Sequence, residues 1–263
     1  MKKSKTNIKS ALLGILFLPV LLGIFFVILR FFSPSAIKFP TVFEIYQDFF
    51  ASLLDIGVLK ALLSTAKYVL ISVVASIILG VALSFILNLS KTIWSATEPT
   101  VDFLRSVPIT FFIPAFAVIL GVSSPHIIWI LAIIPSTLII IVNVATGIKE
   151  LEDPDKQNRL HHFQLLSGNK GKLESFRKVK IYEILPHFIS GFKVSLSYAI
   201  VIVTVLEYMQ MGNEIGLGRL VYNEMEQLNY GRVYSLIIIV GLIGNLLNFL
   251  IESFSKSFFK YGW

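Results

Sequence analysis

The longest stretch of the chain without Asp, Glu, Lys or Arg runs from Ser106 to Ile148 and contains 43 residues. A helix needs about 20 mainly apolar residues to cross a bilayer, so this stretch is long enough for two crossings. Gly121-Val122-Ser123-Ser124-Pro125 lies in its middle, and glycine, serine and proline favour a turn there. We therefore predict two membrane-spanning helices, at about 101–120 and 127–145, joined by a tight turn.

Four more apolar runs are long enough to cross a bilayer. They lie at about 11–29, 68–88, 188–208 and 233–251. The first follows four lysines but is longer than the apolar core of a secretory signal, so we interpret it as an anchor helix. Only 15% of the residues are charged, against roughly 25% in soluble domains. The sequence predicts an all-α membrane protein with six transmembrane helices.

Lysine and arginine fall unevenly on the two sides of these spans. With the N-terminus inside, 15 of them face the cytoplasm and 6 face the opposite side, leaving aside Arg105 and Lys193 near span ends. Short cytoplasmic loops of membrane proteins carry an excess of lysine and arginine. Both termini and the polar loop 149–190 are therefore predicted to be cytoplasmic.

The cytoplasmic loop carries apolar residues at helical spacing in two groups, which Gly168 and Gly171 separate. The groups are Leu160, Phe163 and Leu166, then Leu173, Phe176 and Val179. This pattern predicts two short amphipathic helices, and a membrane protein that holds such a hairpin on one face presents it to a partner. A similar pattern at 42–53 predicts a helix lying in the membrane interface.

The sequence lacks the motifs of common catalytic sites. The segment 167–173 resembles a phosphate-binding loop, but its glycine spacing is wrong and Leu173 replaces the hydroxyl that binds magnesium. His161 and His162 are adjacent, so they point in different directions on a helix, and the chain has no cysteine. The 22 phenylalanines spread through apolar runs argue against a nucleic-acid-binding domain. We predict no catalytic residue, no metal site and no cofactor, and therefore a protein that is not an enzyme.

Glu207 lies at the end of a predicted span, where a carboxylate is costly unless it reaches water or a partner. Three interpretations remain open: a carboxylate in the outer interface, a residue at the mouth of a pathway, and a packing link to a neighbouring loop. Prolines also interrupt the spans, as ordinary membrane-helix composition or as hinges of a transporter. They are Pro19, Pro108, Pro114, Pro135 and Pro186.

Several short motifs follow one another in a characteristic order between residues 39 and 263. They are Phe39-Pro40-Thr41, Ser64-Thr65-Ala66-Lys67-Tyr68, Glu98-Pro99, Leu104-Arg105-Ser106-Val107-Pro108 with Pro114, Glu207-Tyr208-Met209 and Gly216-Leu217-Gly218. In this order they resemble the permease subunits of binding-protein-dependent ABC importers, in particular the nitrate/sulfonate/taurine-type branch. The resemblance implies a set of pathway or gating residues, namely Arg105, Pro108, Pro114, Glu207, Gly216 and Gly218.

In the family resembled, the cytoplasmic loop carries a coupling helix with the pattern Glu-Ala-Ala-x-x-x-Gly, followed by Leu-Pro. Here Gly168 matches the glycine and Leu185-Pro186 matches the later Leu-Pro. His162-Phe163-Gln164 stands in place of Glu-Ala-Ala. The resemblance implies that these six residues couple the chain to an ATPase.

The resemblance also implies an architecture. The fold would be a type I ABC-importer permease-like bundle, with an N-terminal tail and first helix at 1–32 and a core domain of five transmembrane helices at 33–263. The chain would lie in the bacterial cytoplasmic (inner) membrane, paired with a second copy or a close relative. Cytoplasmic ABC ATPase subunits and an extracytoplasmic solute-binding protein would complete the importer. Its solute would be small, such as a nitrate-, sulfonate- or taurine-like anion or a vitamin precursor.

Two other functions remain open. A stand-alone secondary transporter or channel would need ionisable residues inside its spans, and this chain offers few besides Arg105, Lys193 and Glu207. A membrane scaffold without a transported solute would fit the altered coupling segment. Transport by the chain alone would favour the secondary transporter, and co-purification of an ATPase would favour the importer.

Overall fold

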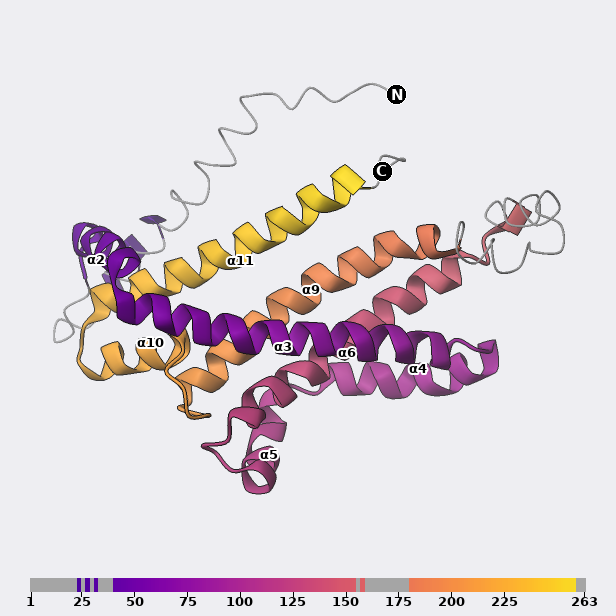
Figure 1. Cartoon of the computed structure of the whole chain (residues 1–263), viewed down its shortest axis with the longest axis horizontal. Coiled ribbons are helices and arrows are strands. Elements are labelled where there is room, and N and C mark those ends of the chain that lie inside the picture. The colour runs from indigo at the N-terminus through magenta and orange to yellow at the C-terminus, as the bar shows by residue number, and fades with distance from the viewer. Residues whose placement is uncertain are drawn as a thin grey trace.

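The structure is a computed structural model that describes residues 23–24, 27–28, 31–32, 40–154, 157–158 and 180–258. Most of the predicted span 11–29 lies outside the described residues, and so does the predicted coupling segment 162–168. The described residues form helices and connecting turns, with no strand among them (Figure 1). This agrees with the predicted all-α class.

Four described helices are long and apolar enough to cross a membrane: α3 (Ile56–Leu87), α6 (Pro125–Glu150), α9 (Ile181–Tyr208) and α11 (Tyr230–Phe258). They coincide with the predicted spans 68–88, 127–145, 188–208 and 233–251. However, α3 begins well before residue 68 and includes Lys60 and Lys67, which the predicted span limits leave in the connector between 29 and 68. The reason is a cap, because the Asp55 side chain accepts a hydrogen bond of 2.7 Å from the Gly57 amide. That bond also lowers the pKa of the Asp55 carboxyl.

The predicted span 101–120 is not one continuous helix. The chain instead forms α4 (Lys91–Ser106), a short 3₁₀ turn, η1 (Ile109–Phe112), and α5 (Ile113–Leu120), with an 84° bend at the break. Val107 is extended because the ring of a following proline disfavours the helical conformation, and Pro108 has no amide hydrogen to continue the ladder. The described residues thus offer four spans, or five if this broken pair counts as one.

The helices α3 and α6 run parallel and in close contact (Figure 1). Three serine hydroxyls of α3 lie 3.3 Å from carbonyl oxygens of α6 that are always 57 residues further along the chain. The pairs are Ser72 with Trp129, Ser76 with Ile133, and Ser84 with Ile141. Gly80 lies between them, and a Cβ there would be 2.7 Å from Ile140 Cβ. Small and hydroxyl side chains thus let the two backbones approach, as is common between membrane helices.

The centre of the fold is α6, with α3 and α9 on either side. In its apolar window 61% of the residues are buried, against 17% for α11, so α6 is the core helix and α11 lies at the periphery. α9 runs back along α6, and the Ser136 hydroxyl donates to the Ser195 carbonyl oxygen at 3.4 Å. The main apolar cluster joins Tyr68 of α3, Leu131 of α6 and Val203 of α9.

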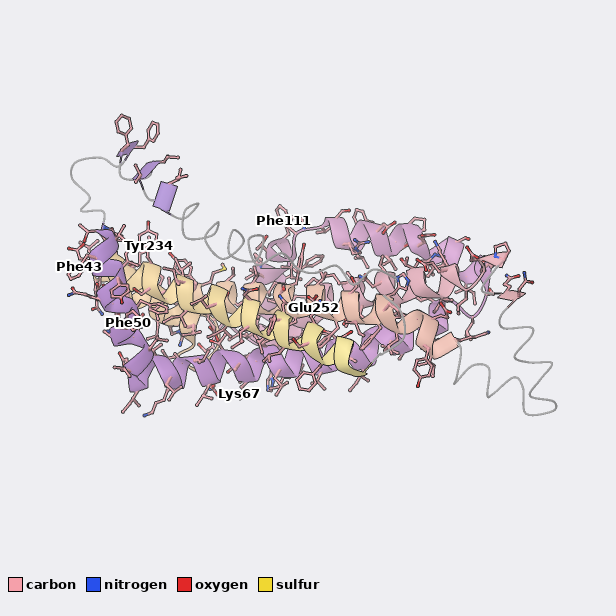
Figure 2. All side chains as sticks on the ribbon, turned by 90° about the horizontal axis from the view of Figure 1, so that it is seen from above. Phe43, Phe50, Lys67, Phe111, Tyr234 and Glu252 are labelled. Carbon is pink, nitrogen blue, oxygen red and sulfur yellow. The ribbon has the colours of Figure 1, made fainter. Side chains whose placement is uncertain are left out.

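Two short helices lie at one end of the bundle (Figure 1). α2 (Val42–Leu54) begins at a capping box of Thr41 and Glu44 and packs on α11, where the Ser235 hydroxyl donates to the Ile45 carbonyl oxygen at 3.0 Å. It confirms the helix predicted at 42–53. Figure 2 places its exposed Phe43 and Phe50 at that end, near Tyr234. The second short helix, α10 (Leu217–Glu226), joins α9 to α11.

Candidate functional site

The carboxylate of Glu207 is buried at the end of α9, with 1% of the residue exposed. Its oxygens accept hydrogen bonds from the Thr65 hydroxyl of α3, at 3.0 and 2.8 Å, and from the Gly218 amide of α10, at 3.1 Å. The Thr65 hydroxyl oxygen in turn accepts a bond of 2.9 Å from the Leu217 amide. These residues and Gly216, which we call the outer junction because the sequence predicts that this end of α9 faces outward, tie three helices together through two side chains.

The glycines of the outer junction leave no room for a side chain. A Cβ on Gly216 would overlap with the Glu207 carboxylate, and a Cβ on Gly218 would overlap with the Thr204 carbonyl oxygen. Glu207, Gly216 and Gly218, which the sequence indicated separately, therefore belong to one contact. Of the three interpretations of Glu207, this geometry supports the packing link.

A second polar layer lies next to the outer junction. Glu214, in the turn after α9, is paired with Lys67 and accepts a hydrogen bond of 2.8 Å from the Ser64 hydroxyl. The bonds from Lys67 and Ser64 stabilise the charged form and lower the pKa of the Glu214 carboxyl. One Arg219 nitrogen donates to the carbonyl oxygens of Gln210, Met211 and Gly212, at 2.6, 3.3 and 3.1 Å. These contacts hold the turn 209–216 on the end of the bundle.

Thr65, Glu214 and Arg219 were not predicted as site residues. Thr65 appeared in the sequence only as one member of the motif Ser64-Thr65-Ala66-Lys67-Tyr68, and its partner Glu207 lies 142 residues further along the chain. Such a pairing requires the folded chain, because nothing local distinguishes Thr65 from Ser64.

A cavity of about 390 Å³ lies where α4 breaks, between α4, α6 and α9. Arg105 lines it, together with Asp102, Ser106, Asn143, Val194 and Tyr198. Pro108 caps η1 at the break, and Pro114 lies in the first turn of α5. The predicted pathway set therefore divides in two: Arg105, Pro108 and Pro114 lie at or near the break, and Glu207 and the two glycines lie at the outer junction. Assignment of either group to a pathway or gate stays a prediction.

The predicted coupling residues His162, Phe163, Gln164 and Gly168 lie outside the described residues. Leu185 and Pro186 lie in the early turns of α9. Leu185 lines an apolar groove of about 290 Å³ with Phe85 and Phe188. In the part of the chain that the structure describes, no group of three or more acidic or histidine side chains is arranged to hold a metal ion.

No protein-family model matches the sequence. Curated proteins do match it. The nitrate import permease protein NrtB of Leptolyngbya laminosa is 27% identical over 75% of this chain and 67% of its own length. The formylaminopyrimidine transport permease protein ThiX of Halalkalibacterium halodurans is 24% identical over 70% of each chain. This chain is related to ABC importer permeases.

These comparisons confirm the resemblance found in the sequence. A third relative, the bicarbonate transport system permease protein CmpB of a Synechocystis strain, is 23% identical over 65% of this chain and 58% of its own length. Matches to these relatives thus span between about three fifths and seven tenths of their lengths. Among solved structures, an inward-facing MetNI methionine ABC transporter matches with a TM-score of 0.55 and 17% identity. That match covers 76% of this chain and 94% of the other, so the two share a fold.

Proposed function

We propose that this chain is the permease subunit of an ATP-driven ABC importer and forms the pathway for a small solute. The observation that carries the proposal is the combination of permease relatives with a shared fold over 94% of the transporter chain. Proteins that are similar in both sequence and fold generally have similar functions, whereas a shared fold alone would leave the function open.

The arrangement of the helices suits the partners that such a subunit needs. α2 and α10 lie at one end, and α6 ends and α9 begins at the other (Figure 1). With six spans and both termini inside, the first end faces outward and offers 39–55 and 211–230 to a binding protein. The loop between α6 and α9 faces the cytoplasmic ATPase. A second permease chain, expected to be another copy, completes the pathway in the bacterial inner membrane.

Such an importer works by alternating between two states that its partners bind with different affinity. In this chain α3, α6 and α9 form the rigid part, because serine hydroxyls, close backbone contact and the outer junction hold them together. The break between α4 and α5 is the place where the packed frame is interrupted. We assign motion to this break and to the segments beside it.

Reconstitution tests the proposal. The chain is produced with a candidate ATPase and a candidate binding protein from the same genome, placed in liposomes, and assayed with labelled nitrate, bicarbonate and formylaminopyrimidine, the solutes in the relatives' names. We expect uptake that requires ATP and all three components. Uptake by this chain alone, driven by an ion gradient, would overturn the proposal in favour of a secondary transporter. Membrane complexes without any uptake or ATPase partner would indicate a scaffold.

The predicted coupling helix gives a variant for the same assay. Phe163→Asp places a charge on the apolar face of that helix, where we expect a cleft of the ATPase. ATP hydrolysis by the complex should continue while uptake falls at least about tenfold. A tenfold weaker association between this helix and the ATPase requires a loss of only about 1.4 kcal/mol of binding free energy. Membrane insertion, followed by the amount of extracted chain, serves as the control. Uptake equal to that of the unaltered chain would contradict a coupling role for Phe163.

A further inference from the structure

The cavity at the end of α4 is lined by a cationic side chain, Arg105, and lies among membrane-spanning helices. Its α6 wall, 134–143, lies well inside the span Pro125–Glu150, and its α9 wall includes Val194 and Tyr198. Arg105 is the one lysine or arginine among the described residues that line this cavity. An ionisable side chain at such a depth is costly unless it faces a water-filled cavity, and it then marks a solute or ion path.

The binding capacity of Arg105 is largely unused within the described part of the chain. Its recorded partner there is Asp102, with Nη1 at 3.3 Å from Oδ1 and side chains that are 43% and 61% exposed. An exposed pair three residues apart on a helix contributes at most a few tenths of a kcal/mol. A guanidinium has five N–H donors in a planar fork that matches carboxylate and sulfonate oxygens. An arriving anion can therefore displace Asp102 from the Arg105 guanidinium, or share the guanidinium with it, at little cost.

The remaining walls favour an organic body next to the charge. Apolar side chains, including Phe112, Leu138 and Val194, line the cavity beside the polar groups of Asn143 and Tyr198. A volume of about 390 Å³ lies in the 300–1,000 Å³ range of small-molecule sites, and the lining presents polar and apolar surface in equal parts, which suits a ligand with a charged end and an apolar body. A bare oxyanion would leave most of these apolar walls without contact.

We propose that this cavity is a solute subsite of the pathway, where Arg105 binds the anionic group of a small organic acid and the apolar walls contact its body. This rests on the proposed importer function and adds to it a place in the chain and a chemical class. The names of the nitrate and bicarbonate permeases would instead suggest a bare inorganic anion.

Charged thiol reagents test the subsite without any transport assay. The chain has no cysteine, so Val194→Cys places a single thiol in the cavity wall, at a residue that is 42% exposed. The full chain with its partner subunits, in permeabilised membranes, is treated with a sulfonate-bearing or a trimethylammonium-bearing methanethiosulfonate. The rate with the sulfonate reagent divided by the rate with the trimethylammonium reagent reports the local electrostatic potential. We expect this ratio to fall about tenfold on adding Arg105→Gln, because removing a unit charge from the same cavity changes each rate severalfold.

Two controls separate charge from structure. Arg105→Lys should restore much of the ratio, since it keeps the charge. Thr92→Cys, on the same helix and roughly 20 Å away by helical rise, should give a ratio that Arg105→Gln leaves unchanged. An unchanged ratio at Val194→Cys, or a faster reaction of the ammonium reagent, would overturn the subsite.

Protection experiments identify the class of ligand. Ethanesulfonate should slow the sulfonate reagent at Val194→Cys when Arg105 is present and should have no effect with Arg105→Gln. Nitrate at the same concentration should protect less, and equal protection would overturn the assignment to an organic anion. Because labelling requires no uptake, absence of ATP-driven transport would reject the importer while leaving this result unaffected. Conversely, a working importer without protection would reject the subsite alone.

Discussion

We expect Gly218→Ala to destabilise the packing of α10 on α9 at the outer junction. The added Cβ would overlap with the Thr204 carbonyl oxygen and lie 2.8 Å from the Tyr208 amide nitrogen. Both atoms belong to the backbone of α9, so neither can rotate away as a flexible side chain would. Forcing a methyl group into such a site costs about 3 kcal/mol, the upper end for overpacking. For a chain of this size that corresponds to a fall in Tm of roughly 6–12 °C.

The measurement is thermal unfolding of the extracted protein in one detergent, followed by loss of the monodisperse peak. Gly241→Ala is the matched control, because Gly241 also lies in a membrane helix but has no atom within 4 Å of an added Cβ. Its Tm should stay within about 1–2 °C of the original, since an alanine is also the better helix former. If both variants had the same Tm as the unaltered chain, α10 would not pack on α9 as described.

The second large effect is expected for Glu207→Ala. Removing the carboxylate leaves the Thr65 hydroxyl and the Gly218 amide without their acceptor in a buried site. A buried donor without a partner costs about 1–3 kcal/mol, so the two together cost about 2–6 kcal/mol. Glu207→Gln keeps the shape and one acceptor oxygen, and it should lose less than half as much.

These two variants also distinguish a packing link from a pathway residue. If Glu207 acts as a packing link, each variant should lose uptake in proportion to its loss of stability. Glu207→Gln should therefore retain most of the uptake. A Glu207→Gln protein with unchanged Tm but abolished uptake would contradict the link and indicate that the charge itself acts on the solute. Thr65→Val, combined with Glu207→Ala, should cost less than the sum of the two single changes, because they remove the same bond.

The sequence located the long helices but not their limits. The apolar runs at 127–145, 188–208 and 233–251 lie within observed helices, and the run at 68–88 passes the end of α3 by one residue. The agreement arises because a hydrocarbon layer requires helices of about this length. Lys60 and Lys67 wrongly marked a connector, because hydropathy finds the part of a helix that suits lipid, whereas the Asp55 cap sets where α3 begins. The uncharged stretch after Ser106 concealed a break whose signal, Val107 before Pro108, was present in the residues.

By itself the sequence determined that this is an all-helical membrane chain and which family it resembles, because both depend on local composition and on the order of short motifs. The tertiary structure decided which polar groups meet. Thr65 bonds Glu207 over a separation of 142 residues and Leu217 over 152, and Arg105, Asn143 and Tyr198 line a single cavity. These contacts follow from the parallel packing of α3 on α6 and the return of α9 along it. Helix register and close approach fix them, and no periodicity in one chain specifies which faces will touch.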